Sequence, residues 1–475
     1  MFGGEAMAFE NPPRFGLQYI LASRGLDGTT QPLQLHSDCI GNGEDPLAKT
    51  FQQIYSGAAS NYVLWNDQFY DDPVPDIDPP CVKYCAKPWG HSKGFMAWQE
   101  DGTGFVVQVT TPDWPGSGGS QYPRKEQGNT LGCCEASGVQ DDNVMVAQHF
   151  FALRLNSAND TLAVLQALHR ASVVTDTKNP QLVKLTSGPS DLKQAASQLG
   201  QQVLDILEPF QGDISARNKA SKVHLIAKPS GLQVPPWHLV SSLLETPLRT
   251  ATWWTKPAIN STHEGYHPGC WHESLKPSTP EVQVGLSGRW QNTTFSFLGV
   301  PKTDGNHAKL GHSLSGRKLA IMSDMNQQGA LDPDNPTGSC DLSQNSRGGL
   351  FFVVEDPVFH AGLVDLMTGE TAAYVNGKSG PERPERVGLW LGLAPQGGGA
   401  GILWTNCKRS DCRYVKKADI ALCNVTQWGC YNATQLPQDC PRLGSLSDVR
   451  SRHYLLASSR VSMRLYMYTC MCMHT

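Results

Sequence analysis

Two His-x-Lys triplets are the residues of this sequence best suited to chemistry on a phosphate group. They are His91-Ser92-Lys93, the first triplet, and His307-Ala308-Lys309, the second triplet. An imidazole can attack phosphorus or carry a proton, and a neighbouring ammonium neutralises the non-bridging oxygens. Because chance alone gives about 0.6 such triplets in a chain of this composition, the elements around the two copies decide what they mean.

Each triplet is predicted to lie beside a strand of the hydrophobic core. The first triplet opens a run whose apolar residues and Asp101-Gly102 turn signal predict a β-hairpin. Residues i and i+2 of a strand point the same way, so His91 and Lys93 are expected on one face. The second triplet is followed by the apolar run 319–322. One motif repeated beside two core strands predicts two similar halves that share one site.

The rest of the chain is predicted to form strands with a few helices between them. The ranges are helices 46–55, 162–171 after a cap at Asn159-Asp160, and 192–207 ending before Pro209, and strands 15–21, 62–65, 223–227, 250–254 and 347–354. The fold class expected from this order is α/β.

Length and composition predict more than one structural unit. The chain has 475 residues with 46 Gly and 32 Pro, and only 17% are charged, which favours strands and loops over long solvated helices. We expect an N-terminal half over residues 1–160 that carries the first triplet and a second half over 161–374 that carries the other. A Cys-rich extension with a disordered tail is expected over 375–475. No run of 18 apolar residues occurs, so no membrane span is expected.

The charge balance favours a polyanionic partner at acid pH. The formal net charge is −4 with 14 His neutral. If every His were protonated, the net charge would be −4 + 14, or about +10. A polyanion would then be repelled weakly at neutral pH and attracted at acid pH.

Cysteine usage indicates an oxidising compartment. The chain has 14 Cys, several of them closely spaced, such as Cys81 and Cys85, and most lack His at ligand spacing. Disulfides are therefore expected rather than metal sites. Five glycosylation sequons agree with a secreted glycoprotein: Asn159, Asn260, Asn292, Asn424 and Asn432. The first residues lack the basic and apolar regions of a signal peptide, so either an intracellular protein or an incomplete N-terminus is expected.

Seven sequence blocks occur in an order that has a parallel in one family. They are Arg14-Phe-Gly-Leu-Gln-Tyr19, Leu64-Trp-Asn-Asp-Gln68, the first triplet with its hairpin, Gly128-Asn-Thr-Leu-Gly-Cys133, the second triplet, Asp324-Met-Asn326 and Arg347-Gly-Gly349. Between Phe15 and Thr368 the chain resembles deoxyribonuclease II, the acid endonuclease of the phospholipase D superfamily. The blocks are specific in combination and order, and none is decisive by itself.

The resemblance implies metal-independent cleavage of DNA at the two triplets. One imidazole would attack the scissile phosphorus to form a phosphohistidine. The other would protonate the leaving 5′ oxygen and later activate water, which leaves 3′-phosphate ends. Family analogy makes His91 the nucleophile and His307 the acid, and the sequence leaves open an exchange of these roles. Lys93 and Lys309 would neutralise the non-bridging oxygens.

The same resemblance implies the architecture and the surroundings of the site. It predicts two phospholipase-D-like halves related by a pseudo-twofold axis, each a mixed sheet flanked by helices, so that a monomer has a pseudo-dimeric core. Asn326 and Arg347 are candidate substrate-binding residues. No cofactor and no metal are expected, the partner is substrate DNA, and the family predicts a lysosomal or secreted protein.

Three departures from the family pattern bear on these expectations. A signal peptide and a first strand are missing. An acidic residue common after the first triplet is replaced by Gln99. Two family cysteines are replaced by Ile321 and Val353, as expected where packing has taken the place of a disulfide.

Three alternative functions are compatible with parts of the sequence. The run His263-Glu-Gly-Tyr-His267 fits the zinc-protease pattern, with Glu264 as base and His272 as third ligand, but Gly265 and Pro268 predict a loop where that chemistry needs a helix. A lipid or other phosphodiesterase of the same superfamily would use the same two triplets, yet no extended apolar segment for membrane docking is present. A non-enzymatic secreted DNA- or glycan-binding protein would act through the Cys-rich extension.

Overall fold

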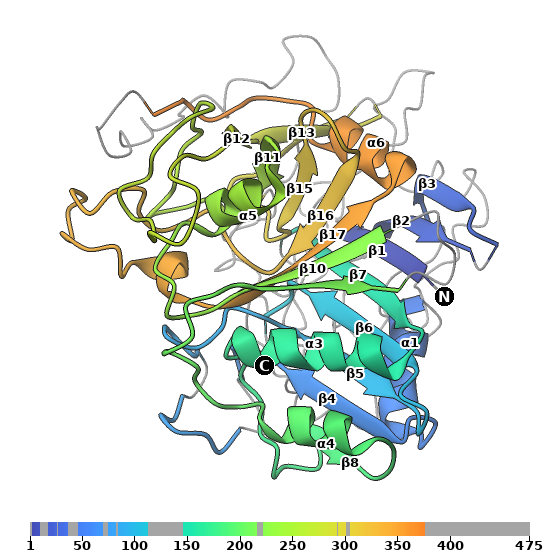
Figure 1. Ribbon diagram of the computed structural model, residues 1–475. Coiled ribbons are helices and arrows are strands. Elements are labelled where there is room, and N and C mark those ends of the chain that lie inside the picture. Colours follow the sequence, from blue (N-terminus) through green and yellow to red (C-terminus); the bar gives the residue numbers. More distant parts are fainter. Residues whose placement is uncertain are drawn as a thin grey trace, which may run out of the picture.

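The computed structural model describes residues 2–9, 18–25, 27–36, 46–69, 75–81, 84–112, 146–215, 222–291, 293–300 and 305–375. These residues form a mixed α/β fold built on two large sheets (Figure 1). The sequence block 128–133 and the Cys-rich extension expected after residue 375 lie outside the described residues.

The first sheet has eight strands in the order β3-β2-β1-β7-β6-β5-β4-β8. Their bounds are β1 Phe2–Phe9, β2 Gln18–Arg24, β3 Thr30–Leu35, β4 Asn61–Trp65, β5 Gly94–Trp98, β6 Gly104–Val109, β7 Gln148–Leu155 and β8 Val183–Leu185. All seven pairings are antiparallel, so the expectation of a mixed sheet is wrong for this half. The sheet is antiparallel because short connections such as the one between β5 and β6 return the chain beside itself. The sheet includes β8, which lies in the chain after residue 160, the predicted end of the first half. The domain boundaries themselves stay predictions.

β1 is a strand that was not predicted from the sequence. It lies between β2 and β7, with Gly4 opposite both Ala22 and Phe151. The sheet thus has an N-terminal strand, and the expectation that the family's own first strand is missing stays a prediction. The run contains a Gly pair, which weakens the sequence signal of a strand because glycine has low β propensity.

The second sheet has seven strands in the order β12-β11-β15-β16-β17-β10-β9. Their bounds are β9 Phe210–Ile214, β10 Lys222–Lys228, β11 Leu248–Ala251, β12 Val282–Val284, β15 Leu310–Ser313, β16 Leu319–Ser323 and β17 Gly349–Glu355. The β11–β12 pairing is parallel and the others are antiparallel, so the expected mixed sheet is confirmed here. A separate hairpin joins β13 (Ser287–Trp290) to β14 (Thr293–Ser296).

The predicted hairpin after the first triplet is confirmed as β5 and β6. Gly102 takes a φ of 82° in the turn, a conformation that glycine adopts without steric cost. The Asp101 carboxylate accepts hydrogen bonds from the backbone N–H and the hydroxyl of Thr103. The turn residues thus fix the register of β5, which lies between β6 and β4 in the sheet.

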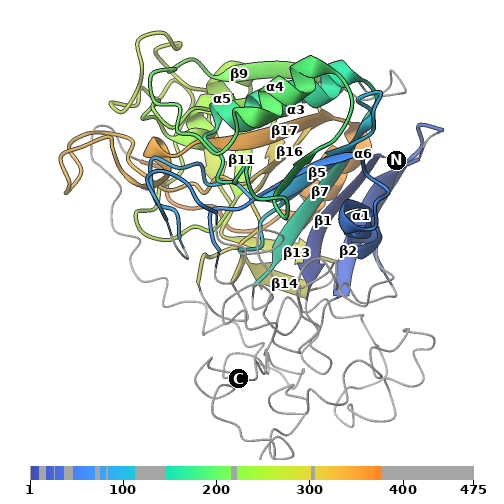
Figure 2. The same cartoon turned by 90° about the horizontal axis from the view of Figure 1, so that it is seen from below.

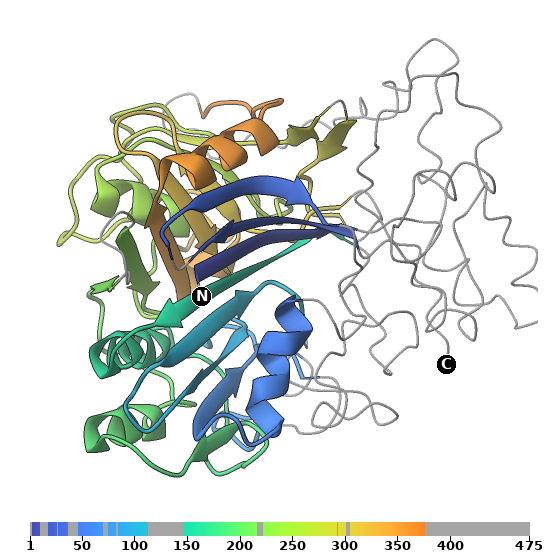
Figure 3. The same cartoon turned by 90° about the vertical axis from the view of Figure 1, so that its right-hand side faces the viewer.

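Residues of the two sheets meet in one hydrophobic core. Phe151 of β7 lies against Phe352 of β17, with ring centroids 5.1 Å apart. On the first sheet, α1 (Pro46–Tyr55), the blue helix of Figure 3, has the bounds predicted from sequence. Its Phe51 packs on Phe95 of β5. Burying aromatic side chains of this size is the main stabilising contribution to such a core.

Four further helices of the described residues cover the sheets. They are α3 Ala158–Arg170, α4 Ser190–Ser197, α5 Pro236–Leu244 and α6 Pro357–Leu366. Trp237 of α5 packs on Phe351 in the smaller core on the outer face of the second sheet. α3 and α4 lie side by side near β9 (Figure 2), and α6 lies over β3 (Figure 3).

Two predicted helix ends are wrong. The N-cap of α3 is Ser157, whose side chain accepts from the backbone N–H of Asp160, rather than Asn159-Asp160. The helix predicted over 192–207 ends at Ser197, because Gly200 turns the chain with a φ of 72° and passes so close to the Thr175 carbonyl that no side chain would fit.

The replaced family cysteines and the expected disulfides can both be located. Ile321 and Val353 are directly opposite one another on β16 and β17 and are fully buried, as packing in place of a disulfide requires. Disulfides join Cys81 to Cys85 and Cys270 to Cys340. Within the described ranges, no helix has the length and hydropathy needed to cross a bilayer.

Candidate active site

Both triplets lie directly before a central strand. Lys93 precedes β5 and Lys309 precedes β15, so the expectation that His91 and Lys93 share one face of a strand is wrong. Each triplet is hydrogen-bonded to the chain just before a strand of the other sheet. The backbone N–H of His91 donates to the carbonyl of Gly348 at 2.8 Å, and that of His307 donates to Ala147 at 2.8 Å. These reciprocal bonds hold the two triplets at the junction of the sheets.

The imidazole rings are also held by residues of the opposite sheet. His91 Nδ1 donates to the backbone carbonyl of Asp324, the residue after β16, at 2.5 Å. His307 Nδ1 donates to Oε1 of Gln148 at 3.0 Å and also bonds the backbone of Thr110, the residue after β6. Because a carbonyl oxygen can only accept, the proton of each neutral ring is on Nδ1. Nε2 of His91 therefore has a free lone pair.

The electrostatic interactions show that the two triplets converge. Burial lowers the pKa of His91 well below its ordinary value, and the charges of Lys93, Arg347 and Lys309 lower it further. Burial likewise lowers the pKa of His307, together with the charges of Lys309, Lys93 and His91. Each imidazole thus interacts with the lysine of the other triplet. The four predicted catalytic residues therefore lie close together, and the two ammonium groups among them would bind an anion.

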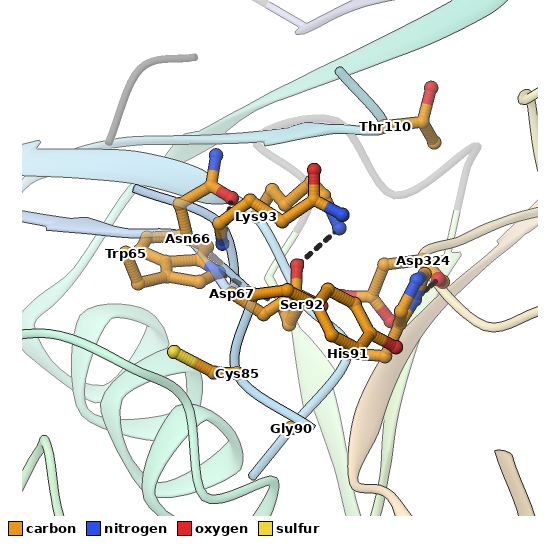
Figure 4. Close-up of polar contacts among 12 residues, drawn as sticks. Trp65, Asn66, Asp67, Cys85, Gly90, His91, Ser92, Lys93, Thr110 and Asp324 are labelled. Carbon is orange, nitrogen blue, oxygen red and sulfur yellow. Dashed lines mark hydrogen bonds and ion pairs between the residues drawn. The ribbon is translucent and has the colours of Figure 1, made fainter. Parts of the chain in front are cut away.

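Lys93 belongs to a closed network of buried charges. Its ammonium pairs with one carboxylate oxygen of Asp67, and the other oxygen accepts from Arg347 Nη2 at 2.7 Å. The side chains of all three are at most 2% exposed. Burial raises the pKa of Asp67, but the charges of Lys93 and Arg347 outweigh it and hold that pKa below its ordinary value. Figure 4 shows Asp67 and Lys93 with His91 and Asp324 around the segment that leads into β5.

Lys309 has different surroundings. Its ammonium donates to the backbone carbonyl of His307 at 2.5 Å, and its backbone N–H donates to Nδ1 of the buried His149 at 3.1 Å. Burial lowers the pKa of Lys309 well below its ordinary value, and the charge of Lys93 lowers it further, against the opposite effect of Asp67 and Asp324. Among the described residues no carboxylate is within ion-pair distance of this ammonium. A bound phosphate would supply the missing negative charge.

The two predicted substrate-binding residues, Arg347 and Asn326, differ in their hydrogen bonds. Arg347 is buried, and its guanidinium donates to the carbonyls of Trp89, Cys85 and Gly90, to Asp67 and to the Tyr84 hydroxyl. These contacts orient the loop before the first triplet, and a direct contact of Arg347 with substrate stays a prediction. Asn326 donates to Gln328 at 2.9 Å, and its own Oδ1 is buried without a partner among the described residues.

Several residues of the site were not predicted from the sequence. Asp67, Gln148 and Thr110 contact the triplets from other elements, and only Asp67 lay in a block that resembles the family. Asp324 supplies the backbone carbonyl for His91, and burial raises the pKa of its side chain to about 7. Each of these residues follows or begins a core strand, and that position is the one sequence signal that would have found them.

The residues of the zinc-protease alternative do not form the required helix. Residues 263–267 make a turn in which Gly265 has a φ of 78°. His267 donates through Nδ1 to the Pro277 carbonyl at 2.8 Å. In the described residues no cluster of three or more His, Cys, Asp or Glu has an arrangement suited to a metal ion.

Comparison with known proteins gives one match. The family model for deoxyribonuclease II matches residues 10–359, which contain both triplets. No curated protein and no solved structure matches the chain.

Proposed function

The chain belongs to the deoxyribonuclease II family and is thus an acid deoxyribonuclease, and we propose that its two triplets hydrolyse one DNA phosphodiester through a phosphohistidine. The observation that carries this proposal is that the backbone and the ring of each histidine are hydrogen-bonded to residues of the other sheet, which brings both imidazoles to one junction. Groups that act on one phosphorus must converge in this way.

In the first step, Nε2 of one histidine attacks the phosphorus. For His91, the free lone pair on that nitrogen supports this role, because Nδ1 carries the proton of the neutral ring. The bond from phosphorus to the 5′ oxygen breaks, and the other histidine, in its protonated form, gives the leaving oxygen a proton through Nε2. The products of this step are a 5′-hydroxyl and a 3′-nucleotide bound to histidine. By family analogy we assign attack to His91 and proton donation to His307.

In the second step, water replaces the histidine on phosphorus. His307, now neutral, takes a proton from the water, whose oxygen attacks phosphorus while the bond to His91 breaks. The product is a 3′-phosphate, and the protonated state of His307 is restored. Lys93 and Lys309 would hold the non-bridging oxygens in both steps, and the chemistry needs no metal ion.

The lowered pKa values explain why such a site would work at acid pH. Above the pKa of both imidazoles neither can donate a proton, and the first step lacks its acid. The positive charges of Lys93 and Lys309 move this point to lower pH, because they disfavour imidazolium. The charge of a protonated His91 also lowers the pKa of His307, so the state with both rings protonated is disfavoured. Asp324, with a pKa of about 7, is neutral there and does not repel the DNA phosphate.

Two further parts of the proposal concern architecture and location. The orders β7-β6-β5-β4 and β17-β16-β15-β11 place one triplet before the third strand of each, which supports two halves related by a pseudo-twofold axis. The disulfides support a lysosomal or secreted protein. Of the sequons, Asn159 is exposed and would accept a glycan, whereas Asn260 is 5% exposed and would not.

The proposal is tested with supercoiled plasmid at pH 5 and pH 7.5, each with and without EDTA. We expect nicking at pH 5 that EDTA does not reduce, much slower nicking at pH 7.5, and ends that require removal of a 3′-phosphate before a polymerase can extend them. Denaturing the enzyme during turnover of 5′-labelled DNA should leave label on the protein that acid removes and alkali does not. Loss of cleavage with EDTA, or 5′-phosphate ends, would contradict the mechanism.

A further inference from the structure

Trp253 lies beside His307, in the second triplet of the catalytic cluster. It follows β11 by two residues, as Asp67 follows β4 by two residues. The centroid of its indole is 5.2 Å from that of the His307 ring, at an interplanar angle of 77°. Asp67 contacts Lys93 in the other half of the cluster. An aromatic ring thus lies next to one histidine where a carboxylate lies near the other.

Trp253 differs from its neighbour in the chain in a way that indicates a surface role. Trp254 is 6% exposed and donates its indole N–H to the carbonyl of Ile259 at 2.8 Å, as expected of a core residue. Trp253 is only half-buried, and so is His307 beside it. The two rings are therefore in contact with one another and both partly accessible to solvent.

The position of the indole depends on a glycine beneath it. A Cβ on Gly299 would come within 2.8 Å of Trp253 Cγ and within 2.7 Å of the Trp253 carbonyl carbon, distances that real structures do not contain. Gly299 is also tied to this segment by a hydrogen bond from its N–H to the Trp254 carbonyl at 3.2 Å. Because Gly299 has no side chain, Cγ of Trp253 can pack directly against the Gly299 backbone. This contact restricts the orientations that the indole can adopt.

We propose that Trp253 stacks on the nucleobase that flanks the scissile phosphate on the His307 side. This inference rests on the proposed function, because it takes the phosphate to be bound between the two triplets. A nucleobase on the neighbouring nucleoside is then within reach of a ring that lies 5.2 Å from the imidazole. Base stacking on an aromatic side chain is favourable with any of the four bases, so it would position DNA without sequence specificity.

Two consequences follow from stacking on one side. The stacked base must leave the base stack of the DNA, and the contact with Trp253 offsets part of the free energy that this costs. The site also becomes asymmetric, since Asp67 takes the corresponding position near Lys93 and is fully engaged by Lys93 and Arg347. One of the two flanking bases would therefore matter and the other would not.

The test uses single-stranded oligonucleotides in which one phosphodiester is cleavable and all other linkages are blocked. Three substrates carry either both flanking bases, an abasic nucleoside on the 5′ side, or an abasic nucleoside on the 3′ side. The enzymes are the wild type, W253A, W253F and the control W271A, in which a half-buried indole far from the triplets is removed. Thermal unfolding establishes that each variant is folded.

We expect the wild type to lose about 10-fold or more in kcat/KM, mainly through KM, on one abasic substrate and little on the other. W253A should lose the same factor on the intact substrate and become indifferent to that abasic site, while W253F keeps most activity and W271A keeps all of it. Equal losses by W253A on all three substrates, or no loss, would overturn the stacking role. Failure of the wild type to cleave the intact substrate would instead overturn the proposed function.

Discussion

The surroundings of the two lysines differ more than those of the two histidines. Both imidazoles donate through Nδ1 to a carbonyl group of the opposite sheet. Lys93, however, is paired with a buried carboxylate that also binds Arg347, whereas Lys309 has only carbonyl contacts of its own triplet for its ammonium. One half of the cluster is thus internally neutralised, and the other carries a cation without a counter-charge among the described residues.

This difference assigns different tasks to the two sides. A buried charge that is already paired and hydrogen-bonded is held rigidly in place, so the Lys93 side fixes the geometry of the site. A buried ammonium without a carboxylate is costly until an anion arrives, so the Lys309 side should gain most from binding a phosphate. The half-buried His307 and Trp253 lie on that second side, which is where we expect the substrate to enter.

Among the substitutions that distinguish the Lys93 side from the Lys309 side, Asp67→Asn should have the largest effect. The substitution leaves Lys93 and Arg347 buried without their counter-charge, and we expect the free energy of unfolding to fall by about 3–5 kcal/mol. Urea unfolding at pH 5 measures it. The matched control is Asp213→Asn, which breaks the surface pair with His224 and should change stability by about 0.5 kcal/mol or less. Equal effects of the two variants would show that the network does not stabilise the first half.

Lys309→Met should act on catalysis more than on stability. We expect kcat to fall by about 10²- to 10³-fold, because one group that stabilises the phosphate oxygens is lost. The charge of Lys309 lowers the pKa of both imidazoles, so its removal raises them. The alkaline limb of the remaining activity should therefore move to higher pH, as measured in a pH–rate profile with an oligonucleotide. A profile unchanged in position would contradict the assigned electrostatic role.

Gln148→Leu should give the smallest of these effects. Its Oε1 accepts from His307 Nδ1 at 3.0 Å, but Thr110 offers the ring a second acceptor. We expect kcat to fall about 10-fold with little change in KM, because the ring is less well oriented and not displaced. Gln211→Leu, at an exposed amide that contacts His224, is the matched control and should leave kcat unchanged. A loss of stability in place of kcat would indicate a structural role for Gln148.

The sequence predicted correctly those elements that depend on residues close together in the chain. The β5–β6 hairpin and the bounds of α1 were correct, since a turn pair and an amphipathic spacing specify them within a few residues. The helix predicted after residue 192 was too long because a close backbone contact between Gly200 and Thr175 ends it. That contact joins segments that are apart in the sequence, and periodicity contains no information about it.

Some residues of the site were predicted from the sequence and others were not. His91, Lys93, His307 and Lys309 carry a recognisable spacing, but Asp67 and Gln148 belong to the site only because strand order brings their ends to the triplets. β1 was missed because a Gly pair hides its strand character and its partners, β2 and β7, are both needed to define it. Residue types indicated the chemistry, and the tertiary arrangement was needed to show which charges are paired.

The central claim is that His91 and His307 act on one phosphorus, and a double-mutant cycle tests it most directly. Single-turnover cleavage of a single-stranded oligonucleotide at pH 5 is measured for wild type, H91A, H307A and the double variant, with thermal unfolding to establish folding. We predict that each single variant loses about 10⁴-fold or more and that the double variant loses no more than either, as for residues that work as a unit. A single variant that keeps nearly wild-type activity, or a double loss equal to the product of the two, would contradict the shared site.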